Sequence, residues 1–94
     1  MKLIDKIQLE VLPEQKILLP SNSKILSITN VPNKNKLLLW FEFETDVYSY
    51  NNKNINEEKT IYAFEPGDYI FSDVSFITTV YVNNKYYHIF KDKS

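Results

Sequence analysis

The side chain best suited to acid–base chemistry is His88, the only histidine in the sequence. Imidazole gains and loses a proton near neutral pH, so His88 would act as a general base if Asp68 or Asp73 oriented it. Thr78 or Thr79 would then be the nucleophile, because both belong to the segment that precedes His88. Threonine is common in strands, however, and packing plus one hydrogen bond explains an isolated histidine. We therefore expect a protein that is not an enzyme and has no catalytic residue.

Two carboxylates, Glu42 and Glu44, point to the same side of one predicted strand, as the acid pair of a glycosidase would. We expect the strand to reach solvent at this point, so a solvated charged face explains the pair better. A metal site would have to combine His88 with isolated carboxylates. The chain has no cysteine and no pair of ligands at a recognisable spacing. The sequence therefore predicts no metal and no cofactor.

Charge and composition argue against further classes of function. The 94 residues carry a formal net charge of −1, and the 11 basic residues are all lysines. Scattered lysines without arginine argue against nucleic-acid binding. A single glycine leaves no glycine-rich phosphate loop. Charges interrupt each apolar run near the start, so we expect no signal peptide, no membrane span and a soluble, cytoplasmic protein.

Aromatic and asparagine side chains supply the remaining candidates for a site. The chain has one tryptophan and seven tyrosines. Tyrosine together with asparagine is typical of recognition surfaces, so we expect a contact surface at Tyr48, Tyr50 and residues 51–56. The candidate partner-binding or ligand-binding residues are Trp40, Tyr48, Tyr50, Asn51, Asn52, Lys59, Tyr87 and His88.

These candidates depend on β-strands for their positions. Residues 36–45, KLLLWFEFET, have apolar side chains at a period of two, which predicts a long central strand. Its apolar face consists of Leu37, Leu39, Phe41 and Phe43. The opposite face begins with Leu38 and Trp40, as expected of a strand that leaves a two-sided core. Similar patterns predict strands at 3–12, 16–19, 25–31, 59–64, 74–82 and 85–90, and a polar loop at 46–58.

Turn residues connect these strands into hairpins. Residues 31–35 should join strand 25–31 to the central strand as antiparallel neighbours. Asn83 and Asn84 tolerate the positive φ of a tight turn and predict a hairpin at the end of the chain. In strand 25–31, Leu26 and Ile28 should face the core. In the last hairpin one face should consist of Phe76, Thr78, Val80 and Val82.

No long segment has a helical periodicity that is clearer than its β alternation, so the sequence predicts an all-β fold. We expect a small antiparallel sandwich or flattened barrel of roughly six to eight strands. It should form a single domain over residues 1–94, with 46–58 as its polar loop. The edge strands of such a domain favour pairing between chains, so we also expect a homo-oligomer.

Short segments along most of the chain carry a resemblance to a known family. They are residues 16–20 (KILLP), 23–28 (SKILSI), 38–40 (LLW) and 87–90 (YHIF), together with Thr79. Their order resembles a family of small uncharacterised proteins encoded by bacteriophages and prophages. The sequence departs from that family at residues 64–68, FEPGD, where the family has a Gly-Thr-Gly-His turn. The resemblance implies a phage accessory protein without a known reaction.

Together these features favour a phage-type, non-catalytic protein that binds and blocks a host protein, as an inhibitor of bacterial defence would. The protein would then lie in the cytoplasm of the host cell. A first alternative is an oligomeric sponge for a small nucleotide-like signal, in which Trp40 or tyrosines stack on the base and Lys59 and Lys85 contact phosphate. A second alternative is a structural or assembly accessory of the virion.

Overall fold

In the part of the chain that the structure describes, the fold consists of antiparallel β-strands. The computed structural model describes residues 1–44, 56–70 and 73–93. In these residues the strands are β1 (Lys2–Glu10), β2 (Glu14–Pro20), β3 (Lys24–Asn30), β4 (Lys36–Glu44), β5 (Asn56–Phe64), β6 (Val74–Val82) and β7 (Lys85–Asp92). The all-β prediction is confirmed. A helix long and apolar enough to cross a membrane does not occur in this part of the chain.

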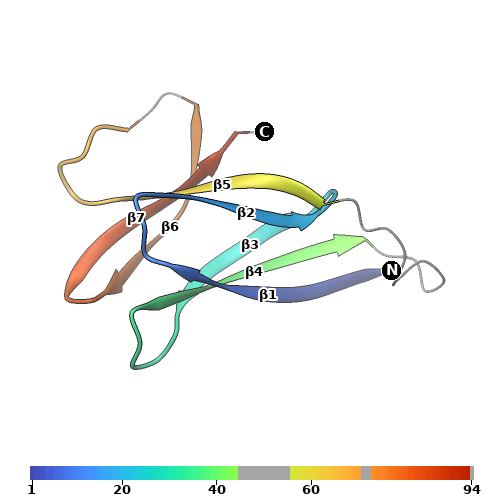
Figure 1. Cartoon of the computed structure of the whole chain (residues 1–94), viewed down its shortest axis with the longest axis horizontal. Coiled ribbons are helices and arrows are strands. Elements are labelled where there is room, and N and C mark those ends of the chain that lie inside the picture. Colours follow the sequence, from blue (N-terminus) through green and yellow to red (C-terminus); the bar gives the residue numbers. More distant parts are fainter. Residues whose placement is uncertain (45–55, 71–72, 94) are drawn as a thin grey trace.

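The strands form two sheets that pack face to face as a sandwich. The three-stranded sheet has the order β1-β4-β3, and the four-stranded sheet has the order β2-β5-β7-β6. In Figure 1, β1, β4 and β3 fan out beside β2 and β5, while the β6–β7 hairpin runs diagonally across the view. As predicted, β4 is a central strand, β2 lies at an edge, and β3 pairs with β4 in an antiparallel hairpin.

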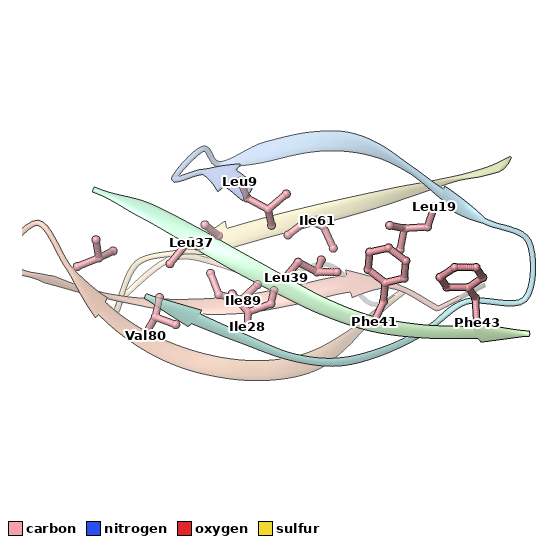
Figure 2. Close-up of a cluster of buried hydrophobic side chains, with 12 residues drawn as sticks. Leu9, Leu19, Ile28, Leu37, Leu39, Phe41, Phe43, Ile61, Val80 and Ile89 are labelled. Atoms are coloured by element: carbon pink, nitrogen blue, oxygen red, sulfur yellow. The ribbon is translucent and has the colours of Figure 1, made fainter. Parts of the chain in front are cut away.

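The core lies between the sheets and is organised around β4. All four apolar residues on one face of β4 are buried, as their period of two predicted. Figure 2 shows how side chains from the other strands meet them between the two sheets. The residues of this core are Leu9, Leu19, Ile28, Leu37, Leu39, Phe41, Phe43, Ile61, Ala63, Val80, Val82 and Ile89. The prediction that β4 has a core on both of its faces is wrong, because Leu38 and Trp40 are partly exposed on the outer face of the sheet.

Two β-bulges change which side chains reach the core. The register between β3 and β4 shifts at Leu26, which is exposed, and Ile25 packs against the core instead. The register between β6 and β7 shifts at Ile77, which also packs against the core, so Phe76 is left outside. A bulge inserts one residue without a partner, and strict alternation therefore fails on one side of it. The inward position predicted for Leu26 is wrong, and that of Ile28 is confirmed. The prediction that Phe76 shares a face with Val80 and Val82 is also wrong, because Phe76 is exposed while both valines are buried.

The predicted loop at 46–58 extends too far. Strand β5 begins at Asn56, three residues before the predicted strand, and Glu58 pairs with Leu18 of β2. Polar residues can belong to a strand where the neighbouring edge strand offers backbone partners and one face is open to water. Lys16 supports this pairing, because its Nζ lies 3.9 Å from Oε1 of Glu58.

Asparagines provide the backbone geometry of the last hairpin. Asn83 and Asn84 have φ values of 56° and 62°, and Val82 pairs with Lys85 on either side of them. Two successive positive φ angles define a type I′ turn, which matches the twist of the strands it joins. The predicted hairpin is confirmed. The turn at 65–68 also has the expected form, with Gly67 at a φ of 98° and a hydrogen bond of 3.0 Å from the amide of Asp68 to the carbonyl of Glu65.

We expect Asn84→Val to lower the free energy of unfolding by about 1–2 kcal/mol, because a β-branched residue resists the left-handed conformation. Asn84→Gly is the matched control and should change stability by less than about 0.5 kcal/mol, since glycine adopts this φ without strain. Urea denaturation followed by circular dichroism measures both values. Equal midpoints for the valine and glycine variants would contradict the positive φ at this position.

Candidate functional site

The outer face of the four-stranded sheet carries two groups of aromatic side chains, with Thr79 and His88 between them. Inner positions of β5, β6 and β7 are used by the core, so the alternate positions point outward. The register places Tyr62 and Phe76 on either side of Phe90, and Tyr81 opposite Tyr86. We name this surface the aromatic face and define it by Tyr62, Phe64, Phe76, Tyr81, Tyr86 and Phe90.

Ring contacts run across the strands of the aromatic face. Phe90 makes edge-on contacts with Phe64, at 5.4 Å between centroids, and with Phe76, at 5.3 Å. Tyr62 stacks on Phe64 at 6.0 Å with an angle of 15° between the planes. Tyr81 and Tyr86 form a separate pair at 4.7 Å near the hairpin turn. Such pairs contribute about 0.5–1.5 kcal/mol each beyond burial, so the rings hold one another in place.

Much of this apolar surface remains open to solvent. Phe76 is 59% exposed, Tyr81 51% and Tyr86 57%. Phe64 is buried, yet it lies outside the core cluster between the sheets. Exposed aromatic rings gathered on one face of a folded domain favour an interaction site. The arrangement therefore resembles a contact surface more than a packing layer.

A shallow cavity of about 300 Å³ adjoins the aromatic face. Its walls combine the rings of Tyr62, Phe64 and Tyr69 with two acidic residues, Glu14 and Asp68. The carboxylate of Asp68 is held by the amide of Glu65, which donates to Oδ2 over 2.8 Å. Aromatic rings beside carboxylates suit a cation, because ring quadrupole and carboxylate both attract positive charge. The cavity is of a size and chemistry that suit a lysine or arginine side chain.

His88 lies on the same outer side, between the positions of Tyr86 and Phe90 on β7. Its Nδ1 lies 2.9 Å from Oγ1 of Thr79, and which atom donates depends on the tautomer. The sequence-based pairing of His88 with a threonine of the preceding strand is therefore confirmed as a hydrogen bond. Among the described residues, no hydrogen bond joins His88 to Asp68 or Asp73, and no group of three acidic, histidine or cysteine side chains is arranged to hold a metal.

The predicted site residues do not gather in one place. Trp40 lies on the outer face of the other sheet, where Nε1 donates to Oγ1 of Thr29 over 3.0 Å and Nζ of Lys6 sits 5.4 Å from the ring centroid. Tyr87 packs against the core, and Lys59 lies on the inner side of β5. Four further candidates lie outside the described residues, namely Tyr48, Tyr50, Asn51 and Asn52.

Most residues of the aromatic face were not predicted as site residues from the sequence. Tyr86, His88 and Phe90 are alternate residues of β7, and Tyr81 is opposite Tyr86 in the hairpin, so this signal is visible in the sequence. Phe76 does not follow the same alternation, because the bulge at Ile77 separates it from the other residues. Only the strand register shows that these rings share one surface.

Comparison with known proteins gives a family but no function. Neither the search of curated proteins nor the search of solved structures finds a match. A family model does match, over residues 1–94, and its description is "Domain of unknown function (DUF7352)". The chain described above is therefore a member of the DUF7352 family.

Proposed function

We propose that this protein is a non-catalytic binding protein that uses its aromatic face to dock on a partner protein. The observation that carries the proposal is the exposure of Phe76, Tyr81 and Tyr86 on one side of a single sheet. Aromatic residues are enriched at protein interfaces because each ring contributes a large contact area at a small loss of conformational entropy. The strands that present the rings are hydrogen-bonded in one sheet, so little ordering is needed on binding.

Charge at the aromatic face favours a basic partner surface. The lysines at its rim are paired, Lys16 with a glutamate of β5 and Lys85 with Glu65 at 3.5 Å. Among the described ion pairs, neither Glu14 nor Asp68 takes part. The cavity beside the rings therefore has a negative lining, and a partner's arginine or lysine would pair with it.

The same charges make a second copy of this chain a weaker occupant. The sequence contains no arginine, so a copy would have to bring a lysine into the acidic cavity. Arginine is the better residue for this cavity, because its planar guanidinium both stacks on rings and pairs with carboxylates. The resemblance to phage proteins supports a host protein as the partner, and blocking that partner as the consequence.

The nucleotide sponge predicted from the sequence has less support. It requires a stacking aromatic beside lysines that contact phosphate. Trp40 lies on the outer face of the three-stranded sheet, and Lys59 lies on the inner side of β5, between the sheets. Lys85 is paired with Glu65. These residues are on separate parts of the molecule, so they do not form one nucleotide site.

Affinity capture from bacterial lysate with matched variants tests the proposal. We expect the tagged chain to retain one protein in stoichiometric amount, and free arginine in the wash to release it. Tyr81→Ser combined with Tyr86→Ser should lose that protein. The control, Ile4→Ser combined with Leu38→Ser, changes partly exposed apolar residues of the other sheet and should keep it.

Three outcomes would overturn the proposal. The first is a partner that the control loses and the tyrosine variant keeps. The second is a partner that both the control and the tyrosine variant retain. The third is that no protein is captured and that size-exclusion chromatography shows two copies of the chain pairing through the aromatic face. Co-fractionation with virus particles in place of a single host protein would favour the virion alternative.

A further inference from the structure

His88 lies between the two groups of rings that make up the aromatic face. The strand register places it directly opposite Thr79 of β6 and Phe64 of β5. Its neighbours on the same side of β7 are Tyr86 and Phe90. A partner that covers the exposed rings of both groups would therefore also cover the imidazole.

One of the two ring nitrogens of His88 has a partner within the described residues. Nδ1 lies 2.9 Å from Oγ1 of Thr79, and this contact orients the ring. The contact is compatible with both charge states, because the hydroxyl group can donate to neutral imidazole and its oxygen can accept from imidazolium. No second hydrogen bond to the imidazole occurs in this part of the chain. His88 can therefore change its charge while it keeps its position.

Within the described residues, no counterion is paired with a positive charge on His88. The side chains that face it from β5, β6 and β7 are uncharged at neutral pH, namely Tyr62, Phe64, Thr79, Tyr81, Tyr86 and Phe90. Glu65, which follows β5, is paired with Lys85 over 3.5 Å. The carboxylates of Glu14 and Asp68 line the cavity beside Phe64, and neither forms a hydrogen bond or ion pair with His88.

A protonated His88 would oppose docking in two ways. Covering the aromatic face removes the imidazole from water, and burial of a charge without a counterion is unfavourable. The proposed partner is basic, so imidazolium would also repel it. Neutral His88 has neither cost, so the complex forms with the proton excluded. Linkage then requires that affinity is full where the imidazole is neutral and is lost as the pH falls.

We infer that His88 is a proton-sensitive switch in the aromatic face, which releases the partner protein on acidification. The inference rests on the proposed function, because it concerns the regulation of that docking surface. His88 is the only histidine of the chain. Histidine is also the one side-chain type that ordinarily changes its charge between about pH 5 and 8. A response of this protein to mild acid should therefore depend on this residue.

The test is to measure binding of the protein retained in the affinity capture to the immobilised full chain at about pH 7.5 and about pH 5.5. We expect the wild-type affinity to fall roughly tenfold at the lower pH, through uptake of one proton. His88→Asn can still hydrogen-bond Thr79 but cannot gain a proton, so its affinity should differ by less than about twofold between the two conditions. His88→Lys carries a permanent charge, and at the higher pH it should bind at least about tenfold more weakly than His88→Asn.

The outcomes separate this inference from the proposed function. Equal wild-type affinities at the two pH values would overturn the switch and leave the docking surface in place. The same holds for a loss at low pH that His88→Asn shares, because groups of the partner would then be responsible. No retained protein at the higher pH would overturn the proposed function and the switch with it. If the His88 variants fail to fold, NMR of the labelled wild-type chain decides, since its single imidazole should titrate at a lower pH in the complex than in the free chain. Titration at the same or a higher pH would overturn the inference.

Discussion

Leu39→Ala is expected to lower the free energy of unfolding by about 3–5 kcal/mol, as the removal of a fully buried leucine commonly does. Leu39 has no exposed surface and lies on the central strand β4. The register places it between Ile7 of β1 and Ile28 of β3. Strands on both sides limit how far the chain can close the resulting cavity. A domain of this size has a total stability of roughly 5–15 kcal/mol, so the variant should lose a large part of it.

The neighbouring residue supplies a control within the same strand. Leu38 is partly exposed on the outer face, where it pairs with Gln8 and Thr29. Leu38→Ala removes the same atoms and should cost less than about 1 kcal/mol, because little burial is lost. Chemical denaturation of both variants measures the difference. Similar losses at the two positions would contradict the sandwich, since they would mean that both faces of β4 are buried.

Phe76→Lys is expected to weaken the partner complex at least about a hundredfold, a loss typical of a central aromatic residue at an interface. The variant removes an exposed ring from the aromatic face and adds a positive charge that would repel a basic partner. Phe76→Ala, which only removes the ring, should cost roughly tenfold. Surface plasmon resonance with the captured partner measures both affinities.

Ile4→Lys is the matched control for this substitution. Ile4 is 67% exposed and lies opposite Glu42 on the outer face of the other sheet, so the variant introduces the same charge at a comparable surface position. Its partner affinity should stay within about twofold of the wild type, since scattered surface substitutions away from an interface have small effects. An equal loss for Ile4→Lys and Phe76→Lys would show that net charge, and not the aromatic face, controls binding.

Much of the fold could be predicted from local patterns. Every second residue from Leu37 to Phe43 is apolar and buried, and the asparagine pair at the last turn specifies a hairpin through its tolerance of positive φ. Bulges at Leu26 and Ile77 could not be predicted, because an added residue has no signature in the alternation itself. The start of β5 was also missed, since its polar residues are held in the strand by pairing with β2.

The candidate site was less accessible to sequence analysis. Whether a ring belongs to the core or to an open surface depends on which face of a sheet is covered, and that is a property of the whole sandwich. His88 was assigned one stabilising hydrogen bond, and Thr79 supplies it. Trp40 proved to be on the opposite sheet from the exposed tyrosines.

Hydroxyl-radical footprinting of the free chain and of its partner complex is the most direct test of the central claim. Oxidation of aromatic side chains reports their exposure, and the three-stranded sheet carries the partly exposed ring of Trp40 for comparison with the exposed rings of the aromatic face. We predict that Phe76, Tyr81 and Tyr86 lose reactivity in the complex and that Trp40 keeps it. Protection of Trp40 with unchanged reactivity of the aromatic face would contradict the account and move the contact surface to the three-stranded sheet.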